Sequence, residues 1–283
     1  MASEPPAFMR PRILRSDAGE ISYLENGAGP VLLLLHGIGS GARSWRNQLA
    51  TLADRFRVIA WDAPGYGSSQ SLAPATPDAG DYARALAAFL AALGIVRCHL
   101  LGHSLGSLMA ARFAAEWPGR LASLTLASIA SGHAALPDAE RERLRRGRLD
   151  DLQALGPRGM AEKRGPKLLS PNATDAMRQA VIDTMSAINP DGYAQAVRML
   201  SLADTRADIA RLPSELPLQI LFGERDEITT PEQNLRCASA QPRAPVYVVP
   251  EAGHAVYIEQ PQAFNELVAR FVAACRAQEG ASL

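Results

Sequence analysis

Short apolar runs alternate with longer amphipathic stretches over the first 130 residues of the chain. The runs VLLLL at 31–35 and FRVIAW at 56–61 are continuously apolar, as expected of strands that are buried on both faces. Further strands are predicted at 98–101 and 122–127, and an opening antiparallel hairpin at 12–25. Helices are predicted at 42–54, 78–93, 105–116 and 261–277. Strands that alternate with helices predict an α/β fold with a mostly parallel sheet, covered by helices on both faces.

The pattern changes at about residue 131. From there the sequence has no strong strand, and charged helical stretches are interrupted by GPRG, RGPK, SPN and NPDG. Strands then return with PLQILFG at 217–223 and APVYVVP at 244–250. Both halves supply strands to one sheet, so we predict a core domain at 1–130 and 213–283 with a helical insertion at 131–212. Ligands of open α/β sheets bind at the carboxyl ends of the strands, which makes this insertion a predicted lid rather than a separate helical domain.

Composition narrows the classes of partner. The 29 basic and 29 acidic side chains cancel, which argues against nucleic acid or an anionic membrane as a partner. The 27 Arg outnumber the two Lys, Lys163 and Lys167, so a lysine Schiff base would have two candidates. Five His are the short list of acid–base groups that titrate near neutral pH. We therefore expect the substrate to be a small molecule and the protein to be a monomer or a homodimer.

The cysteines and the apolar segments bear on location. Three widely spaced Cys offer neither a disulfide framework nor metal-ligand spacing, and the His, Cys and Asp positions form no metal motif. The N-terminal MASEPPAFMRPR lacks an apolar signal core, and VLLLLH at 31–36 is too short to span a bilayer. We expect a cytoplasmic protein without a metal or cofactor.

The most specific motif is Gly102-His103-Ser104-Leu105-Gly106, which lies between a predicted strand and a predicted helix. In this context G-x-S-x-G is the nucleophile elbow, a tight turn that presents a serine hydroxyl at the start of a helix. The alternative is a glycine-rich turn with an idle serine. We predict Ser104 as the nucleophile and assign the adjacent His103 a structural position beside the pocket.

A serine nucleophile needs a base, and the base needs an acid that orients it. In this fold the three follow in the order Ser, acid, His. His254 follows a predicted strand at 246–249, and Asp226 follows one at 218–222, so both lie at carboxyl ends of strands, as Ser104 does. Glu224 and Glu227 compete with Asp226, which is preferred because three residues of loop after the strand let it turn back over the sheet.

Acyl transfer also needs N–H donors for the developing oxyanion. We expect these from the backbone of Leu105, at the start of the helix, and of Ile38, in the loop after the strand at 31–35. The remaining expected pocket residues are His36, Gly37, His103, Met109, Ile129, Tyr193 and Val256.

The loop after the first buried strand also fits a rival function. Residues 37–42 match G-x-G-x-x-A, and Asp62 lies at about the distance at which an acidic residue holds a ribose. An NAD(P)-binding oxidoreductase is therefore the second class of function. It would leave the elbow, Asp226 and His254 as coincidences.

Taken together, these motifs resemble the α/β-hydrolase superfamily over nearly the whole chain. The resemblance rests on HGIGS at 36–40, DAPGYGSS at 62–69, GHSLG at 102–106, GERD at 223–226 and GHAVYIEQP at 253–261. It implies an eight-stranded, mostly parallel sheet with a helical cap, and the triad Ser104, Asp226 and His254. Serine at the elbow departs from the haloalkane dehalogenases and epoxide hydrolases, which use Asp there.

Within the superfamily, NPDGY at 189–193 and the GHAVYIEQP ending are similar to 3-oxoadipate enol-lactonases and related carboxylesterases. Cofactor-free haloperoxidase-like esterases fit too. Meta-cleavage-product hydrolases, which cut C–C bonds of aromatic-degradation intermediates, share the opening motifs but often carry Trp where this chain has Ala255. The predicted function is hydrolysis of a small ester or lactone. C–C hydrolysis is the alternative, and a non-catalytic ligand receptor is a third class.

Overall fold

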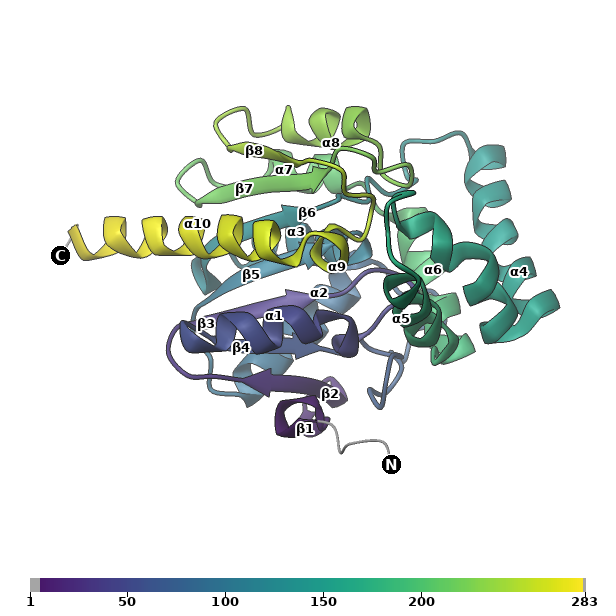
Figure 1. Cartoon of the computed structure of the whole chain (residues 1–283), viewed down its shortest axis with the longest axis horizontal. Coiled ribbons are helices and arrows are strands. Elements are labelled where there is room, and N and C mark those ends of the chain that lie inside the picture. Colours follow the sequence, from purple (N-terminus) through teal and green to yellow (C-terminus); the bar gives the residue numbers. More distant parts are fainter. Residues whose placement is uncertain (1–5, 282–283) are drawn as a thin grey trace.

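The computed structural model describes residues 6–281 and builds them around one twisted sheet (Figure 1). Residues 1–5 and 282–283, which the sequence assigns to the core domain, lie outside the described residues. The strands are β1 (Arg12–Ser16), β2 (Gly19–Asn26), β3 (Val31–Leu35), β4 (Arg57–Trp61), β5 (Cys98–His103), β6 (Leu121–Ala127), β7 (Leu218–Gly223) and β8 (Val246–Val249). Their order across the sheet is β1-β2-β4-β3-β5-β6-β7-β8. The two pairs that involve β2 are antiparallel and the other pairs are parallel, which confirms the predicted eight-stranded, mostly parallel sheet.

Helices cover both faces of the sheet. The core helices are α1 (Arg46–Thr51), α2 (Ala79–Ala92), α3 (Leu105–Glu116), α8 (Pro231–Ala238), α9 (Val256–Glu259) and α10 (Pro261–Ala281), with 3-10 turns η1 (Ala7–Met9), η2 (Ala42–Trp45), η3 (Leu52–Asp54) and η4 (Pro118–Arg120). On one face, Leu49 of α1 and Phe264 of α10 pack in the same buried cluster as the strand residue Leu34. On the other, Phe89 of α2 and Phe113 of α3 pack with the strand residue Leu33. Neighbouring residues of β3 thus face opposite layers, which explains why this strand is apolar throughout.

Between β6 and β7 the chain is helical, as the sequence predicts for this stretch. This segment contains α4 (Asp138–Arg164), η5 (Gly165–Leu168), α5 (Asp175–Ser186), α6 (Pro190–Leu202) and α7 (Thr205–Ala210). In Figure 1, α4, α5 and α6 gather at one end of the sheet. The last helix is different, because α7 contacts α3 and α8 of the core. Part of the residues predicted as an insertion therefore packs as a core layer.

The helix α4 is bent at its middle. Gly156 has φ 65° and ψ 177°, outside the helical region, and Pro157 follows it. Proline has no N–H to donate and disfavours a helical conformation in the residue before it, so the helix breaks and restarts at this pair. The bend separates Arg148 in the first half from Arg164 at the end of the second half.

Candidate active site

The turn between β5 and α3 holds Ser104 in a strained conformation. Its φ of 53° and ψ of −117° lie in a region that residues with a Cβ rarely occupy. Neighbouring glycines allow the turn: a Cβ on Gly102 would lie 2.3 Å from the Gly106 carbonyl oxygen, and one on Gly106 would lie 2.3 Å from that of Leu35. The spacing G-x-S-x-G is thus a steric requirement of the close approach between strand and helix.

Strand register brings the expected oxyanion loop beside this turn. Leu35 at the end of β3 lies opposite Gly102 of β5, so the residues that follow each strand become neighbours. A Cβ on Gly37 would lie 3.0 Å from the Cβ of Ser104. Ile38 and Leu105 both line the cavity beside Ser104, and the Ile38 N–H donates to no acceptor among the described residues. Leu105 is the first residue of α3, where backbone N–H groups have no partner within the helix.

Asp226 and His254 meet across the loops that follow β7 and β8. The His254 Nδ1 lies 2.9 and 3.1 Å from the two carboxylate oxygens of Asp226. A Cβ on Gly223 would lie 2.2 Å from the Gly253 carbonyl oxygen, so a glycine at the end of β7 lets the two loops come this close. The side chains are nearly inaccessible to solvent, with 0% exposure for Asp226 and 3% for His254.

Asp226 is held as a carboxylate by its donors. It accepts hydrogen bonds from the N–H of Ile228 at 2.9 Å, from the N–H of Thr229 at 2.8 Å and from the Thr229 hydroxyl at 2.8 Å. Burial acts to raise the pKa of Asp226, but the charge of His254 and the hydrogen bonds from His254 and Thr229 outweigh burial and hold the pKa at about 2. The acid is therefore ionised over the whole neutral range.

Sequence reasoning missed Thr229, which lies between the acid and the base. Its Oγ1 is 2.8 Å from the Asp226 carboxylate and 3.2 Å from the His254 Nδ1. An Asp followed three residues later by Thr is a pattern in which the carboxylate accepts local backbone N–H groups, so the signal was present in the DEIT stretch. The competing acids of that stretch, Glu224 and Glu227, are exposed.

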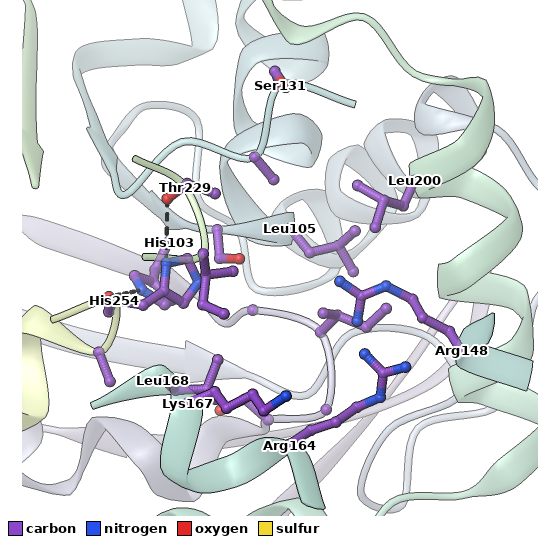
Figure 2. A pocket seen from close by; sticks show the side chains of 18 of the residues that line it. His103, Leu105, Ser131, Arg148, Arg164, Lys167, Leu168, Leu200, Thr229 and His254 are labelled. Atoms are coloured by element: carbon purple, nitrogen blue, oxygen red, sulfur yellow. Dashed lines mark hydrogen bonds between the residues drawn. The ribbon is translucent and has the colours of Figure 1, made fainter. Parts of the chain in front are cut away.

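His103 is hydrogen-bonded to the loop that carries His254. Its Nε2 lies 2.9 Å from the carbonyl oxygen of His254, so the ring holds this loop in place. Burial, and then the charge of His254, lower the pKa of His103 to about 3, so the ring is neutral. This location agrees with the structural position that the sequence assigns to His103, and its side chain also borders the pocket (Figure 2).

A cavity of about 660 Å³ lies between this edge of the sheet and the α4–α6 helices. That volume suits a small-molecule ligand. Its lining includes the expected residues Gly37, Ile38, His103, Ser104, Leu105, Tyr193 and His254. Asp226 lies behind His254 and does not reach the cavity. Ser104 and His254 thus face one space, and the acid is shielded from it.

Four expected pocket residues do not line the cavity, and their assignment is corrected. Met109 and Ile129 belong to the buried cluster on the α2–α3 face of the sheet, and Val256 to the cluster on the α1–α10 face. His36 is fully buried; its Nδ1 lies 2.8 Å from the Gly37 carbonyl oxygen and its Nε2 accepts from the Ala63 N–H at 3.0 Å. Proximity in sequence to the loops placed these residues at the pocket, whereas packing turns their side chains into the core.

In the structure, the loop that matches a dinucleotide-binding motif and its expected ribose ligand, Asp62, have other contacts. Asp62, the expected ribose ligand of that alternative, accepts hydrogen bonds from the Ala42 N–H at 2.8 Å and the Ser22 hydroxyl at 2.6 Å. A Cβ on Gly67 would lie 2.3 Å from the same carboxylate. Asp62 therefore links β2 and the start of η2 inside the protein, and Gly37 and Gly39 line the cavity beside Ser104 instead.

The described residues contain neither a cluster of metal ligands nor a helix that could cross a membrane. No group of three or more His, Cys, Asp or Glu in the described part of the chain is placed to hold a metal ion. Within residues 6–281, no helix combines the length and apolar character needed to cross a membrane.

Comparison with known proteins places this geometry in a family. The chain is 33% identical over 254 residues to the RutD protein of Variovorax paradoxus (strain S110), whose name proposes carbamate hydrolysis, covering 87% of this chain and 92% of RutD. It is 27% identical over 276 residues to a 2-hydroxy-6-oxononadienedioate/2-hydroxy-6-oxononatrienedioate hydrolase of Pseudomonas sp., covering 90% and 92%. It is also 31% identical over 251 residues (86% of this chain) to the dihydrolipoyllysine-residue acetyltransferase component of the acetoin cleaving system of Pseudomonas putida, of whose length it spans 64%.

Solved structures agree with these relatives. A thermophilic esterase from Thermogutta terrifontis superimposes with a TM-score of 0.84 at 26% identity, covering 94% of this chain and 99% of the esterase. The enol-lactonase from Burkholderia xenovorans LB400 has a TM-score of 0.82 at 22% identity, covering 93% and 100%, and shows the likeness of fold. The profile of the family described as alpha/beta hydrolase fold matches residues 30–261, and the chain therefore belongs to the α/β-hydrolase family.

Proposed function

We propose that the protein is a serine hydrolase that cleaves a small carboxylic ester or lactone through an acyl-enzyme. The observation that carries the proposal is the buried Asp226–His254 pair, with His254 facing the cavity that Ser104 lines. An orienting acid, a base and a nucleophile on a strained turn are the three parts that activated serine chemistry requires.

In this mechanism His254 takes the proton of the Ser104 hydroxyl as the oxygen attacks the ester carbonyl. Asp226 keeps the imidazole in the tautomer with the proton on Nδ1 and stabilises the imidazolium that forms. The N–H groups of Ile38 and Leu105 donate to the oxyanion, each contributing about 3–4 kcal/mol to the transition state. His254 then protonates the leaving alkoxide, and a water deprotonated by His254 releases the acid.

The helices between β6 and β7 act as a lid in this proposal. They form the far side of the cavity, and part of this segment is hydrogen-bonded to the loop that carries the base: the Ala255 N–H donates to the Leu168 carbonyl at 2.8 Å. A lid of this kind excludes water from the acyl-enzyme and shapes the space that the substrate fills. Substrate choice is then a property of the lid wall.

The Ser104→Ala variant tests the function. We expect turnover of short 4-nitrophenyl esters to fall by at least about 10⁴-fold, because the nucleophile is removed and only binding and the oxyanion donors remain. A fluorophosphonate probe should label the wild type and leave the variant unlabelled. Circular dichroism controls for folding. Retained turnover in a folded variant contradicts the mechanism, and labelling of the wild type without ester turnover favours the receptor alternative.

C–C bond hydrolysis is the second candidate. It is supported by the 27% identity to the Pseudomonas sp. dienoate hydrolase over nearly the full length of both chains. The absence of Trp after His254, where Ala255 stands, counts against it. A panel of aryl esters, enol-lactones and a ring-cleavage dienoate separates the two: the ester proposal predicts that kcat/KM for the dienoate is the lowest of the three.

A further inference from the structure

The lid wall of the cavity carries an excess of positive charge. The lining contains five basic residues of fixed charge, Arg143, Arg148, Arg164, Lys167 and Arg236. Among the described residues that line the cavity, Glu140 is the one acid. The whole chain has no net charge, so this concentration is local and not a consequence of composition. A cleft lined by charge of one sign raises the local concentration of ligands of the opposite sign.

Three of these basic residues have acidic partners in the protein. Arg143 lies 3.8 Å from Glu140, Arg236 lies 3.7 Å from Glu232, and Arg164 is paired with Asp151. The pairing of Arg164 is incomplete, because Asp151 also accepts from Lys163 at 2.7 Å, and the Arg164 Nε is buried without a hydrogen-bond partner. The single carboxylate of Asp151 is thus shared between Lys163 and Arg164.

Arg148 and Lys167 are left without an acid. Neither makes an ion pair or a side-chain hydrogen bond with any other described residue, although Arg148 is partly buried. Figure 2 shows the side chains of Arg148, Arg164 and Lys167 pointing toward one another in the pocket, across from His254 and Thr229. Burial, and then the charge of Arg148, lower the pKa of the neighbouring His133, so that ring adds no charge of its own near neutral pH.

We propose that Arg148, Arg164 and Lys167 bind a carboxylate of the substrate, which makes the natural substrate an ester or lactone with a free carboxylate away from the bond that is cleaved. This inference rests on the proposed hydrolase function and names its substrate class. Guanidinium groups match carboxylates with two parallel hydrogen bonds, and the flexible ammonium of Lys167 adds a point charge. The anion supplies the partner that Arg148 and Lys167 lack, and it sits opposite the nucleophile, so the bond to be cleaved is directed to Ser104.

A pair of esters with equal chain length tests the charge requirement. Mono-4-nitrophenyl adipate and 4-nitrophenyl hexanoate share the leaving group and six acyl carbons and differ in the terminal carboxylate. We expect kcat/KM of the wild type to be at least about tenfold higher for the adipate ester, since its terminal carboxylate accepts charge-assisted hydrogen bonds that the methyl group of the hexanoate ester cannot make. The preference should shrink with added salt, because ions screen it. Equal kcat/KM values for the two esters overturn the proposal.

Variants locate the subsite. We expect Arg148→Gln and Lys167→Gln each to lower the ratio of kcat/KM for the adipate ester to that for the hexanoate ester by severalfold, and the double variant to bring this ratio close to one. The matched control is Arg146→Gln, because Arg146 lies on the same helix, pairs with Glu142 and does not line the cavity. Equal losses on both esters, or a loss in the control of the same size, contradict the assignment.

Binding to an inactive variant separates this proposal from the hydrolase function. In Ser104→Ala, which does not turn over esters, titration calorimetry should show the monomethyl ester of adipate binding at least about tenfold more tightly than methyl hexanoate, with the difference reduced after Arg148→Gln. This measurement needs no turnover, so it stands even where the ester assays fail. Inorganic phosphate is the competing anion: tighter binding of phosphate than of the adipate ester overturns the assignment to a carboxylate.

Discussion

The cavity has two unlike walls. The wall from the strand ends carries Ser104, His254 and, behind them, Asp226; all three are buried, and Asp226 and His254 are hydrogen-bonded to each other. The wall from α4 and η5 carries Arg148 and Lys167, whose charges have no partner among the described residues. Burying a charge is costly unless donors or acceptors in the protein replace water. On the first wall the buried Asp226 carboxylate meets that condition within the protein. On the second wall Lys167 is exposed to water, and we propose that an anion meets the condition for the half-buried Arg148.

This difference separates two tasks. Chemistry needs groups held within a fraction of an ångström, which strand register and the hydrogen bonds to Asp226 and His254 provide. Substrate choice needs a surface whose polar groups are free to bind something new. The strand-end wall is expected to be sensitive to every substitution, for all substrates alike, whereas the lid wall is expected to be sensitive only for charged substrates.

Substitution of Asp226 is the prediction with the largest expected effect, and it tests whether the two walls have separate tasks. We expect Asp226→Asn to lower kcat by about 10⁴-fold for charged and neutral esters alike, because an amide favours the wrong tautomer of His254. A loss confined to the adipate ester would contradict the division between the walls. The Glu227→Gln variant is the control in the same loop, since Glu227 is exposed.

The same acid gives the protein a pH-dependent stability. The pKa of Asp226 is lowered in the folded state from its ordinary value of 3.8 to about 2. Its contribution is therefore complete above about pH 4 and is lost as the pH falls through 2, an effect of about 2 kcal/mol. Urea unfolding between pH 5 and 2 should show a shallower decline for Asp226→Asn than for the wild type. Identical slopes would show that the acid is not stabilised in the folded state.

Substitution of Thr229 tests a residue of the strand-end wall that positions Asp226. We expect Thr229→Val to lower kcat by about tenfold with KM nearly unchanged, because the hydroxyl that donates to Asp226 at 2.8 Å is removed from a buried pair. Thr229→Ser keeps the hydroxyl and should restore most of the activity. The acid limb of unfolding should also move to higher pH in the valine variant. A rise in KM alone would show that Thr229 contacts substrate and does not position the acid.

The smallest effect on activity is expected at Glu259, which connects the two walls. Glu259 accepts from the Gly253 N–H at 2.9 Å and the Ser170 N–H at 2.8 Å, which ties the His254 loop to the lid segment. Glu259→Gln places an amide NH₂ against one of these donors, and we expect it to cost about 1–3 kcal/mol of stability with a loss of activity of a few fold. The control is Glu266→Gln, which alters an exposed pair with Arg270 on α10 worth less than about 1 kcal/mol. Equal shifts in Tm for Glu259→Gln and the control would show that the hydrogen bonds of Glu259 contribute no more to stability than an exposed ion pair.

Most of the sheet could be predicted from local pattern, and some of the site could not. Apolar runs marked each inner strand, and the glycines around Ser104 marked the turn, because burial and steric limits act on neighbouring residues in sequence. The edge strand β8 has the predicted bounds 246–249, although Tyr247 and Val248 are exposed there. The short helices α8 and α9 were not predicted, because one or two turns give too little periodicity.

By itself the sequence determined which groups we propose to carry the chemistry, because their motifs depend on spacing within one turn or loop. Only the tertiary structure decided which residues face the cavity. His36, Met109, Ile129 and Val256 lie close in sequence to cavity-lining residues, and packing buries their side chains in the core. Arg148 and Lys167 lie 19 positions apart in a charged stretch without a motif, and the bend of α4 turns both into one space. A side chain's direction depends on the layers packed around it, and that information is not local.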